Sequence, residues 1–76
     1  MKELIKYIAQ ALVDHSDQVE VTEIKAQQTL VLELRVAKED LGKVIGKKGR
    51  TANALRVVMR AASAKRGFSS IVKIVD

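Results

Sequence analysis

The sequence predicts an α+β fold in which three helices pack against one three-stranded sheet. Apolar residues recur at helical spacing near the N-terminus and again in the second half of the chain. Between them, two stretches alternate apolar and polar residues as half-buried strands do, and a short aliphatic run closes the sequence. With a short helix before the long one, the expected order of elements is α-β-β-α-α-β.

The first expected helix covers residues 3–14. Lysine and glutamate between its apolar positions make it amphipathic and unlike a secretory signal peptide. The turn-forming residues 14–17 then end it. Its apolar stripe consists of Leu4, Ile5, Ile8, Ala11 and Leu12.

Two strands follow and are expected to pair as a hairpin. The first covers about residues 18–26, where the alternation of apolar residues changes parity, so a β-bulge is expected near Thr22 and Glu23. The second covers residues 30–36 and alternates without interruption.

A short helix is then expected over residues 38–45, with Leu41, Val44 and Ile45 facing inward. Residues 46–49 interrupt the helical pattern with two glycines.

The longest helix is expected over about residues 50–66. Lys65 and Arg66 suit the negative end of its dipole, and Gly67 is a natural stop. Residues 71–75 form the expected final strand. The apolar stripe of this helix consists of Ala52, Leu55, Val58, Met59 and Ala62.

Basic residues are concentrated in the second half of the chain. Residues 1–42 contain five Lys or Arg and eight Asp or Glu, a net charge of −3. Residues 43–76 contain nine Lys or Arg and a single acid, Asp76, a net charge of +8. This asymmetry indicates that a polyanion contacts the second half, and a solvated basic face without a ligand is the simpler alternative.

The composition argues against several classes of function. The chain has no cysteine and one histidine, His15, so neither a zinc site nor a Ser-His-Asp arrangement is expected. No apolar run approaches the ~18 residues that cross a bilayer, and the glycine spacing does not fit a P-loop. We therefore expect a cytoplasmic protein that is not an enzyme, with no catalytic residue, metal site or cofactor.

The most distinctive stretch joins the last two expected helices. Gly46 and Gly49 bracket Lys47 and Lys48, and Arg50 follows. Glycine leaves no Cβ between the backbone and a ligand, and the start of a helix attracts anions. The stretch therefore predicts a clamp for a nucleic-acid phosphate, although a helix cap with solvated lysines is the alternative. The candidate binding residues are Lys43, Val44, Ile45, Gly46, Lys47, Lys48, Gly49 and Arg50.

Residues 44–50, Val-Ile-Gly-Lys-Lys-Gly-Arg, resemble the V-I-G-x-x-G signature of KH domains. The expected order of elements is similar to the prokaryotic (type II) arrangement of that fold. Residues 39–43 before the signature and residues 50–52 after it extend the similarity to the KhpA family of small bacterial proteins. The resemblance covers residues 1–76 as a single KH domain.

This resemblance implies single-stranded RNA as the ligand, about four nucleotides of it, with the glycine loop on the backbone. Residues 46–49 would hold phosphates, Val44 and Ile45 would line an apolar floor for bases, and the long helix and an edge strand would form the walls. The resemblance also implies a KhpB-like KH protein as partner, and a role as an RNA chaperone in cell elongation, cell shape and peptidoglycan homeostasis. Small residues exposed at one end of the long helix also allow a homodimer.

Two other functions remain open from the residues alone. A helix-turn-helix protein could place the long helix in the major groove, where Arg56 and Arg60 share one face but Asn53 alone is suited to reading bases. A KH fold that has lost nucleic acid could serve as a protein-interaction module.

Overall fold

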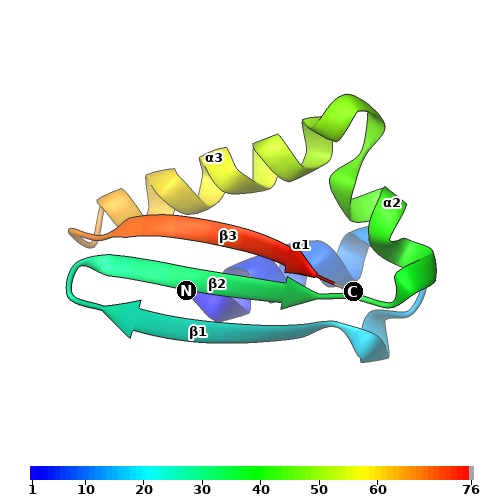
Figure 1. The fold of residues 1–76 in the computed structure, drawn as a ribbon, viewed down its shortest axis with the longest axis horizontal. Helices are drawn as coiled ribbons and strands as arrows, with labels where there is room; N and C mark the ends of the chain where they lie inside the picture. The colour runs from blue at the N-terminus through cyan, green and yellow to red at the C-terminus, as the bar shows by residue number, and fades with distance from the viewer. Residues whose placement is uncertain (76) are drawn as a thin grey trace.

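The computed structural model describes residues 1–75. It confirms the expected α+β order, with a three-stranded sheet and three helices in the described part of the chain (Figure 1). The elements are α1 (Lys2–Leu12), β1 (Glu20–Ala26), β2 (Thr29–Arg35), α2 (Leu41–Ile45), α3 (Arg50–Ala64) and β3 (Ser69–Val75).

The sheet has the order β1-β2-β3, with β1 antiparallel and β3 parallel to the central strand. The hairpin register is unbroken from the pair Glu20–Arg35 to the pair Ala26–Thr29, so the expected bulge is wrong. The change of parity has a simpler cause: Ile24 lies on the sheet face that the helices leave open, and 49% of its surface is exposed.

One face of the sheet carries the hydrophobic core. The side chains of β2 alternate between this face and the open one, as its regular pattern predicts. In Figure 1, α1 lies behind the sheet and α3 runs along β3, so both helices pack on the same side. Their apolar stripes meet the strands in a single cluster, which consists of Ile5, Ala9, Val19, Leu30, Leu32, Leu34, Val36, Val44, Leu55, Met59 and Val72.

The first helix is shorter than expected and rotated relative to the predicted stripe. It ends at Leu12, and its fully buried positions are Ile5 and Ala9, while Ala11 is exposed. Burial follows the one line of the helix that touches the sheet. Apolar residues beside that line, such as Leu4, stay partly exposed.

The second half departs from expectation in similar ways. Residues 38–45 divide into a 3₁₀ turn and the five-residue α2, and Ile45 does not face inward but is 38% exposed. Helix α3 ends at Ala64, two residues early, and Val58 in its predicted stripe is 43% exposed. Strand β3 starts at Ser69, two residues before the predicted strand.

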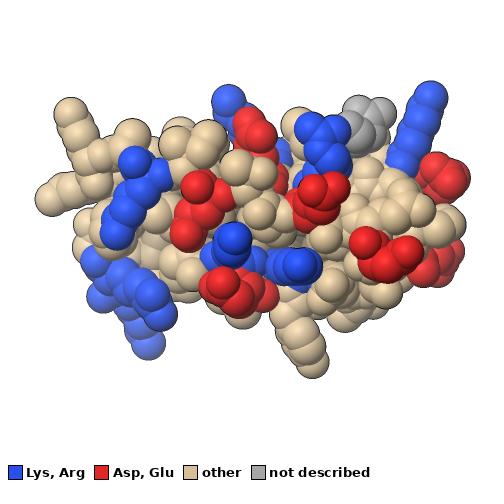
Figure 2. All heavy atoms as spheres, turned by 90° about the horizontal axis from the view of Figure 1, so that it is seen from below, with Lys and Arg blue, Asp and Glu red and all other residues tan. Residues whose placement is uncertain are grey.

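The side of the molecule formed by the β1 edge carries mixed charge. Figure 2 views the molecule from that side, opposite α3, and acidic and basic side chains are interspersed there. No helix within residues 1–75 is both long enough and apolar enough to cross a membrane.

Candidate nucleic-acid interface

The glycine loop connects α2 to α3 through three residues with positive φ. Gly46 has φ 75° and ψ 173°, Lys48 has φ 57°, and Gly49 has φ 74°. The Gly46 N–H donates to the Gly42 carbonyl at 2.9 Å, and the Gly49 N–H donates to the Gly46 carbonyl at 3.1 Å. The loop is thus a defined turn that reverses the chain directly before α3.

The two glycines are needed for different reasons. The backbone angles of Gly46 belong to a region that only glycine populates readily, and a Cβ there would lie 2.7 Å from Thr51 Cβ and 2.9 Å from the Thr51 backbone nitrogen. Gly49 is left-handed helical, and a Cβ there would meet no atom within 4 Å. Gly46 therefore lets the loop pack closely on the first turn of α3.

The basic side chains of this loop are available to a ligand. Lys47, Lys48 and Arg50 are all exposed, and none of the three forms an ion pair with another residue in the part of the chain that the structure describes. No side chain caps the N-terminus of α3 either. The positive end of the helix dipole therefore lies beside three cations without an ion-pair partner among the described residues, an arrangement suited to an anion.

The aliphatic pair before the loop is divided between core and surface. Val44 has no exposed surface and packs in the core, whereas Ile45 is 38% exposed. Of the two residues expected to form an apolar floor, Ile45 alone offers side-chain surface to a base. Val44 instead fixes the end of α2, and with it the start of the loop.

A buried carboxylate holds the start of α2. Asp40 is 1% exposed, and its oxygens accept hydrogen bonds from the backbone N–H of Asp14 at 3.3 Å and of His15 at 2.9 Å. His15 Nδ1 also lies 2.9 Å from Asp40 Oδ2. Lys43 Nζ pairs with the Asp14 carboxylate and lies 3.7 Å from Asp40 Oδ1. The turn after α1 is therefore bound to α2, 25 residues further along the chain.

These contacts change the pKa values of the groups involved. Burial alone raises the pKa of Asp40, but the hydrogen bonds from His15 and from the Asp14 backbone outweigh it and lower the pKa from 3.8 to about 2. The hydrogen bond to Asp40 and the attraction of its charge raise the pKa of His15 above 6.5. The hydrogen bond to Asp14 likewise raises the pKa of Lys43. All three shifts favour the charged forms.

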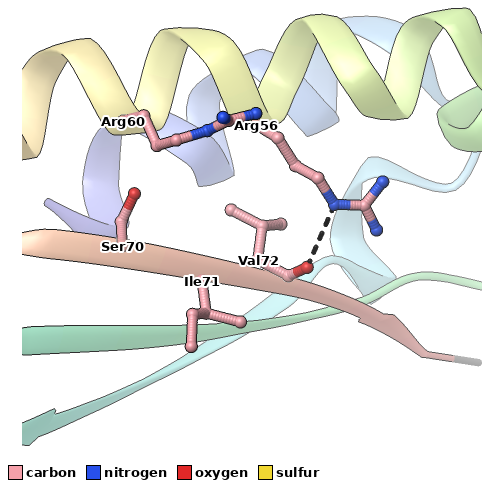
Figure 3. Close-up of a pocket in the computed structure, with 5 residues that line it drawn as sticks. All are labelled: Arg56, Arg60, Ser70, Ile71 and Val72. Atoms are coloured by element: carbon pink, nitrogen blue, oxygen red, sulfur yellow. Dashed lines mark hydrogen bonds between the residues drawn. The ribbon is translucent and has the colours of Figure 1, made fainter.

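A groove of about 310 Å³ lies between α3 and the free edge of β3. Arg56 and Arg60 form its helix wall, and Ser70, Ile71 and Val72 form its strand wall (Figure 3). Arg56 Nε–H donates to the Val72 carbonyl at 3.4 Å, across the groove. The groove therefore has an aliphatic and backbone wall facing two guanidinium groups.

The structure brings most of the predicted site together. Residues 45–50 form the exposed loop and the start of α3. The other two predicted residues, Lys43 and Val44, support α2 and thereby the position of the loop. Sequence reasoning left out the Asp40 cluster and the hydroxyl of Ser70. An acid beside the motif was a visible signal, but nothing in the sequence indicated its partners.

The order of elements, the parallel β2–β3 pair and the glycine loop between α2 and α3 define a KH domain of type II. A sequence model of the family "KhpA/KhpB, KH domain" matches residues 2–74. The chain belongs to this family.

Several curated relatives resemble the chain over nearly its whole length, and each is named RNA-binding protein KhpA. The relative from Caldanaerobacter subterraneus subsp. tengcongensis is 53% identical and that from Clostridium acetobutylicum 49%, in both cases over 99% of this chain and 100% of the relative. The relative from Aquifex aeolicus is 45% identical over 100% of this chain and 96% of its own. No solved structure matches the chain significantly.

Proposed function

We propose that this protein binds single-stranded RNA in the cytoplasm, with the glycine loop on the phosphates and the α3–β3 groove on the bases. The observation that carries the proposal is the set of free cations, Lys47, Lys48 and Arg50, beside the uncapped start of α3. The relatives' shared name supports RNA as the polyanion.

Each part of the site has a chemical task in this proposal. Gly46 and Gly49 let a phosphate approach the backbone, while Lys47, Lys48 and Arg50 neutralise its charge. Ile45 contributes apolar surface to the nearest base. Val44 supports the loop from the core, and Lys43 holds α2 in place through its acidic partners.

The bases would contact aliphatic and backbone groups. The chain has one tyrosine and one phenylalanine, and neither lines the groove. Aromatic stacking, which strengthens many single-strand complexes, is thus absent from the α3–β3 groove. A lone domain should therefore bind weakly, and a second linked KH domain would raise the effective affinity.

The direct test replaces both loop lysines by acids. Lys47→Asp with Lys48→Asp should remove most RNA binding, because repulsion replaces attraction, while aspartate tolerates the left-handed backbone at Lys48. The matched control, Lys2→Asp with Lys6→Asp, makes the same charge change on exposed positions of α1. Fluorescence anisotropy with a labelled RNA measures binding, and circular dichroism checks folding.

Three results would contradict the proposal. If the loop variant does not fold, the two lysines have a structural role. If it folds and binds RNA normally, the phosphate clamp lies elsewhere. A preference for duplex DNA over single-stranded RNA in competition would favour the helix-turn-helix alternative.

The proposal includes the family's wider role. We propose that the protein acts as an RNA chaperone with a KhpB-like partner, and that the pair affects cell elongation, cell shape and peptidoglycan homeostasis. This part rests on the family resemblance alone. Deletion of the gene, with the loop double variant as a complementing allele, tests it: the allele should fail to restore cell length.

The outer face of α3 supports contact with a second KH domain. A hollow of about 450 Å³ there is lined by Val57, Val58, Ala61, Ala62 and Lys65. Val57 is 58% and Val58 43% exposed, and contiguous exposed apolar surface of this kind commonly marks an interaction site.

Val57→Asp should therefore dissociate any homodimer into monomers, or prevent binding of the KhpB-like partner, without loss of fold. Ala11→Asp adds the same charge at an exposed position of α1 and should leave both unchanged. Light scattering of the protein alone and with the partner distinguishes the two complexes. Unchanged masses for Val57→Asp would exclude this face.

A further inference from the structure

His15 lies in the turn after α1 and contacts the residue that begins α2. Its ring Nδ1 and its backbone nitrogen both lie 2.9 Å from Asp40 Oδ2. Asp40 is 1% exposed, whereas 41% of the His15 side chain is exposed. The histidine can therefore exchange a proton with solvent while the carboxylate that it contacts stays buried.

The surroundings of the His15 ring are more negative when the imidazole is neutral. Three carboxylates face it: Asp14 from its own turn, and Glu39 and Asp40 from the 3₁₀ turn before α2. Lys43 of α2 is paired with Asp14 and lies 3.7 Å from Asp40 Oδ1. Loss of the His15 proton therefore adds one uncompensated negative charge at the start of α2.

Helix α2 connects this group of charges to the glycine loop. Because α2 has five residues, it is about 7.5 Å long. This length is no greater than the Debye length of about 8 Å at physiological ionic strength. The Gly46 N–H donates to the Gly42 carbonyl at 2.9 Å, so the first residue of the loop is bonded to the helix. Both the charge and the position of the helix start therefore reach the loop.

We infer that His15 is a positioning residue of the phosphate clamp: acting through Asp40 and α2, its protonated form strengthens RNA binding. The inference rests on the proposed RNA binding and adds a regulation of the same site. When His15 loses its proton, its hydrogen bond to Asp40 is no longer between opposite charges and weakens. The uncompensated carboxylate also repels phosphate.

Both effects lower the affinity for RNA as the pH rises. The hydrogen bond to Asp40 and the charge of Asp40 raise the pKa of His15, so the change takes place above pH 6.5. Because a single, partly screened charge is involved, the affinity should fall about two- to threefold across this transition.

The test measures the affinity for an adenosine hexamer by fluorescence anisotropy between about pH 6 and 9, with a dye that does not titrate in this range. The hexamer carries no terminal phosphate, because a phosphate monoester itself titrates at about pH 6. Wild-type affinity should fall as the pH rises. His15→Gln, which is neutral throughout, should stay at the weaker level, and His15→Lys, which keeps a positive charge, at the stronger level.

Gln18→Lys is the matched control for net charge. Gln18 is exposed in the same segment after α1, and no contact between it and Asp40 is recorded in the described part of the chain. This variant adds a positive charge without replacing the histidine, so it should keep the pH dependence of the wild type. Circular dichroism at both ends of the pH range checks that each protein is folded.

A nuclear magnetic resonance titration of the wild type provides a second readout that needs no variant. His15 is the only histidine in the sequence, so its ring C–H signals report its protonation without overlap from another histidine. Since linkage is reciprocal, the pKa of His15 should be higher in the complex with the hexamer than in the free protein.

The outcomes separate this inference from the proposed function. If the hexamer binds with an affinity that does not vary with pH, or if the His15 titration is the same with and without RNA, this inference is wrong and the proposed function stands. A pH dependence of wild-type size in His15→Gln would likewise overturn it, because another group would then cause the effect. Failure of the wild type to bind the hexamer at any pH would overturn the proposed function as well.

Discussion

At the start of α2, the buried carboxylate of Asp40 is paired, whereas beyond the end of this helix the charges are free. Asp40 is buried among the backbone N–H groups of Asp14 and His15 and the ring of His15. Beyond the other end of this five-residue helix, Lys47 and Lys48 are exposed and have no ion-pair partner within residues 1–75.

The difference shows that position, not the number of cations, decides what is available to a ligand. Lys43 is only four residues from Lys47, yet it is paired with Asp14 and lies near Asp40. Lys43 therefore contributes to folding, and the loop lysines remain available for binding. The anchored end also keeps the loop in place, so less conformational entropy of the loop is lost when a ligand binds.

The largest expected effect comes from breaking the anchored end. Asp40→Ala leaves two buried backbone N–H groups and a histidine ring without their acceptor, so the thermal midpoint should fall by roughly ten degrees. Asp17→Ala is the control, because Asp17 is exposed and forms no ion pair in the described residues. Differential scanning calorimetry measures both. Equal midpoints would show that Asp40 does not stabilise the fold.

Changing the free end should affect binding more than stability, and differently at its two glycines. In Gly46→Ala, the alanine would occupy backbone angles that only glycine adopts readily, and its Cβ would clash with Thr51. Most RNA affinity should therefore be lost. Gly49→Ala meets no atom and costs only the left-handed backbone penalty, about 1–2 kcal/mol. Anisotropy titrations of the two variants should thus differ clearly. The reverse order would contradict the close packing described for Gly46.

The pH dependence of stability should report on the anchored end. The lowered pKa of Asp40 means that its contribution is present above pH 3.8 and is lost as the pH falls towards about 2. The raised pKa of His15 means that its contribution is present below pH 6.5 and is lost as the pH rises through the folded-state value. Denaturant midpoints should therefore be highest between these limits.

In His15→Gln, the fall of the denaturant midpoint at high pH should become smaller, while the fall at low pH remains. If the midpoint of this variant falls at high pH as much as that of the wild type, another group causes that loss of stability.

The smallest expected effect separates the two kinds of lysine by salt. Three phosphate contacts predict a slope of about −2 for log affinity against log salt on a single strand. Lys47→Met should reduce the magnitude of this slope by about 0.7. Lys43→Met should leave it unchanged, because the structure pairs Lys43 with acids. A smaller slope for Lys43→Met would instead place that lysine on the RNA.

The sequence by itself determined the order of elements and the glycine loop. Helical and alternating periods are local properties, and so are two glycines that bracket two lysines before a helix. Local patterns locate element ends less precisely. Helix α3 ends at Ala64 because the Arg66 and Gly67 N–H groups bond to carbonyls three residues back, and β3 begins at Ser69, whose N–H donates to the Gln28 carbonyl.

Only the tertiary structure decided which of these residues are covered and which groups meet. Ile24 and Val58 are apolar but partly exposed, because no other element lies over them. The partners of Asp40 lie 25 and 26 residues away, and the groove exists because β3 returns beside α3. Burial and pairing depend on segments that the fold brings together, and no local pattern records which segments those are.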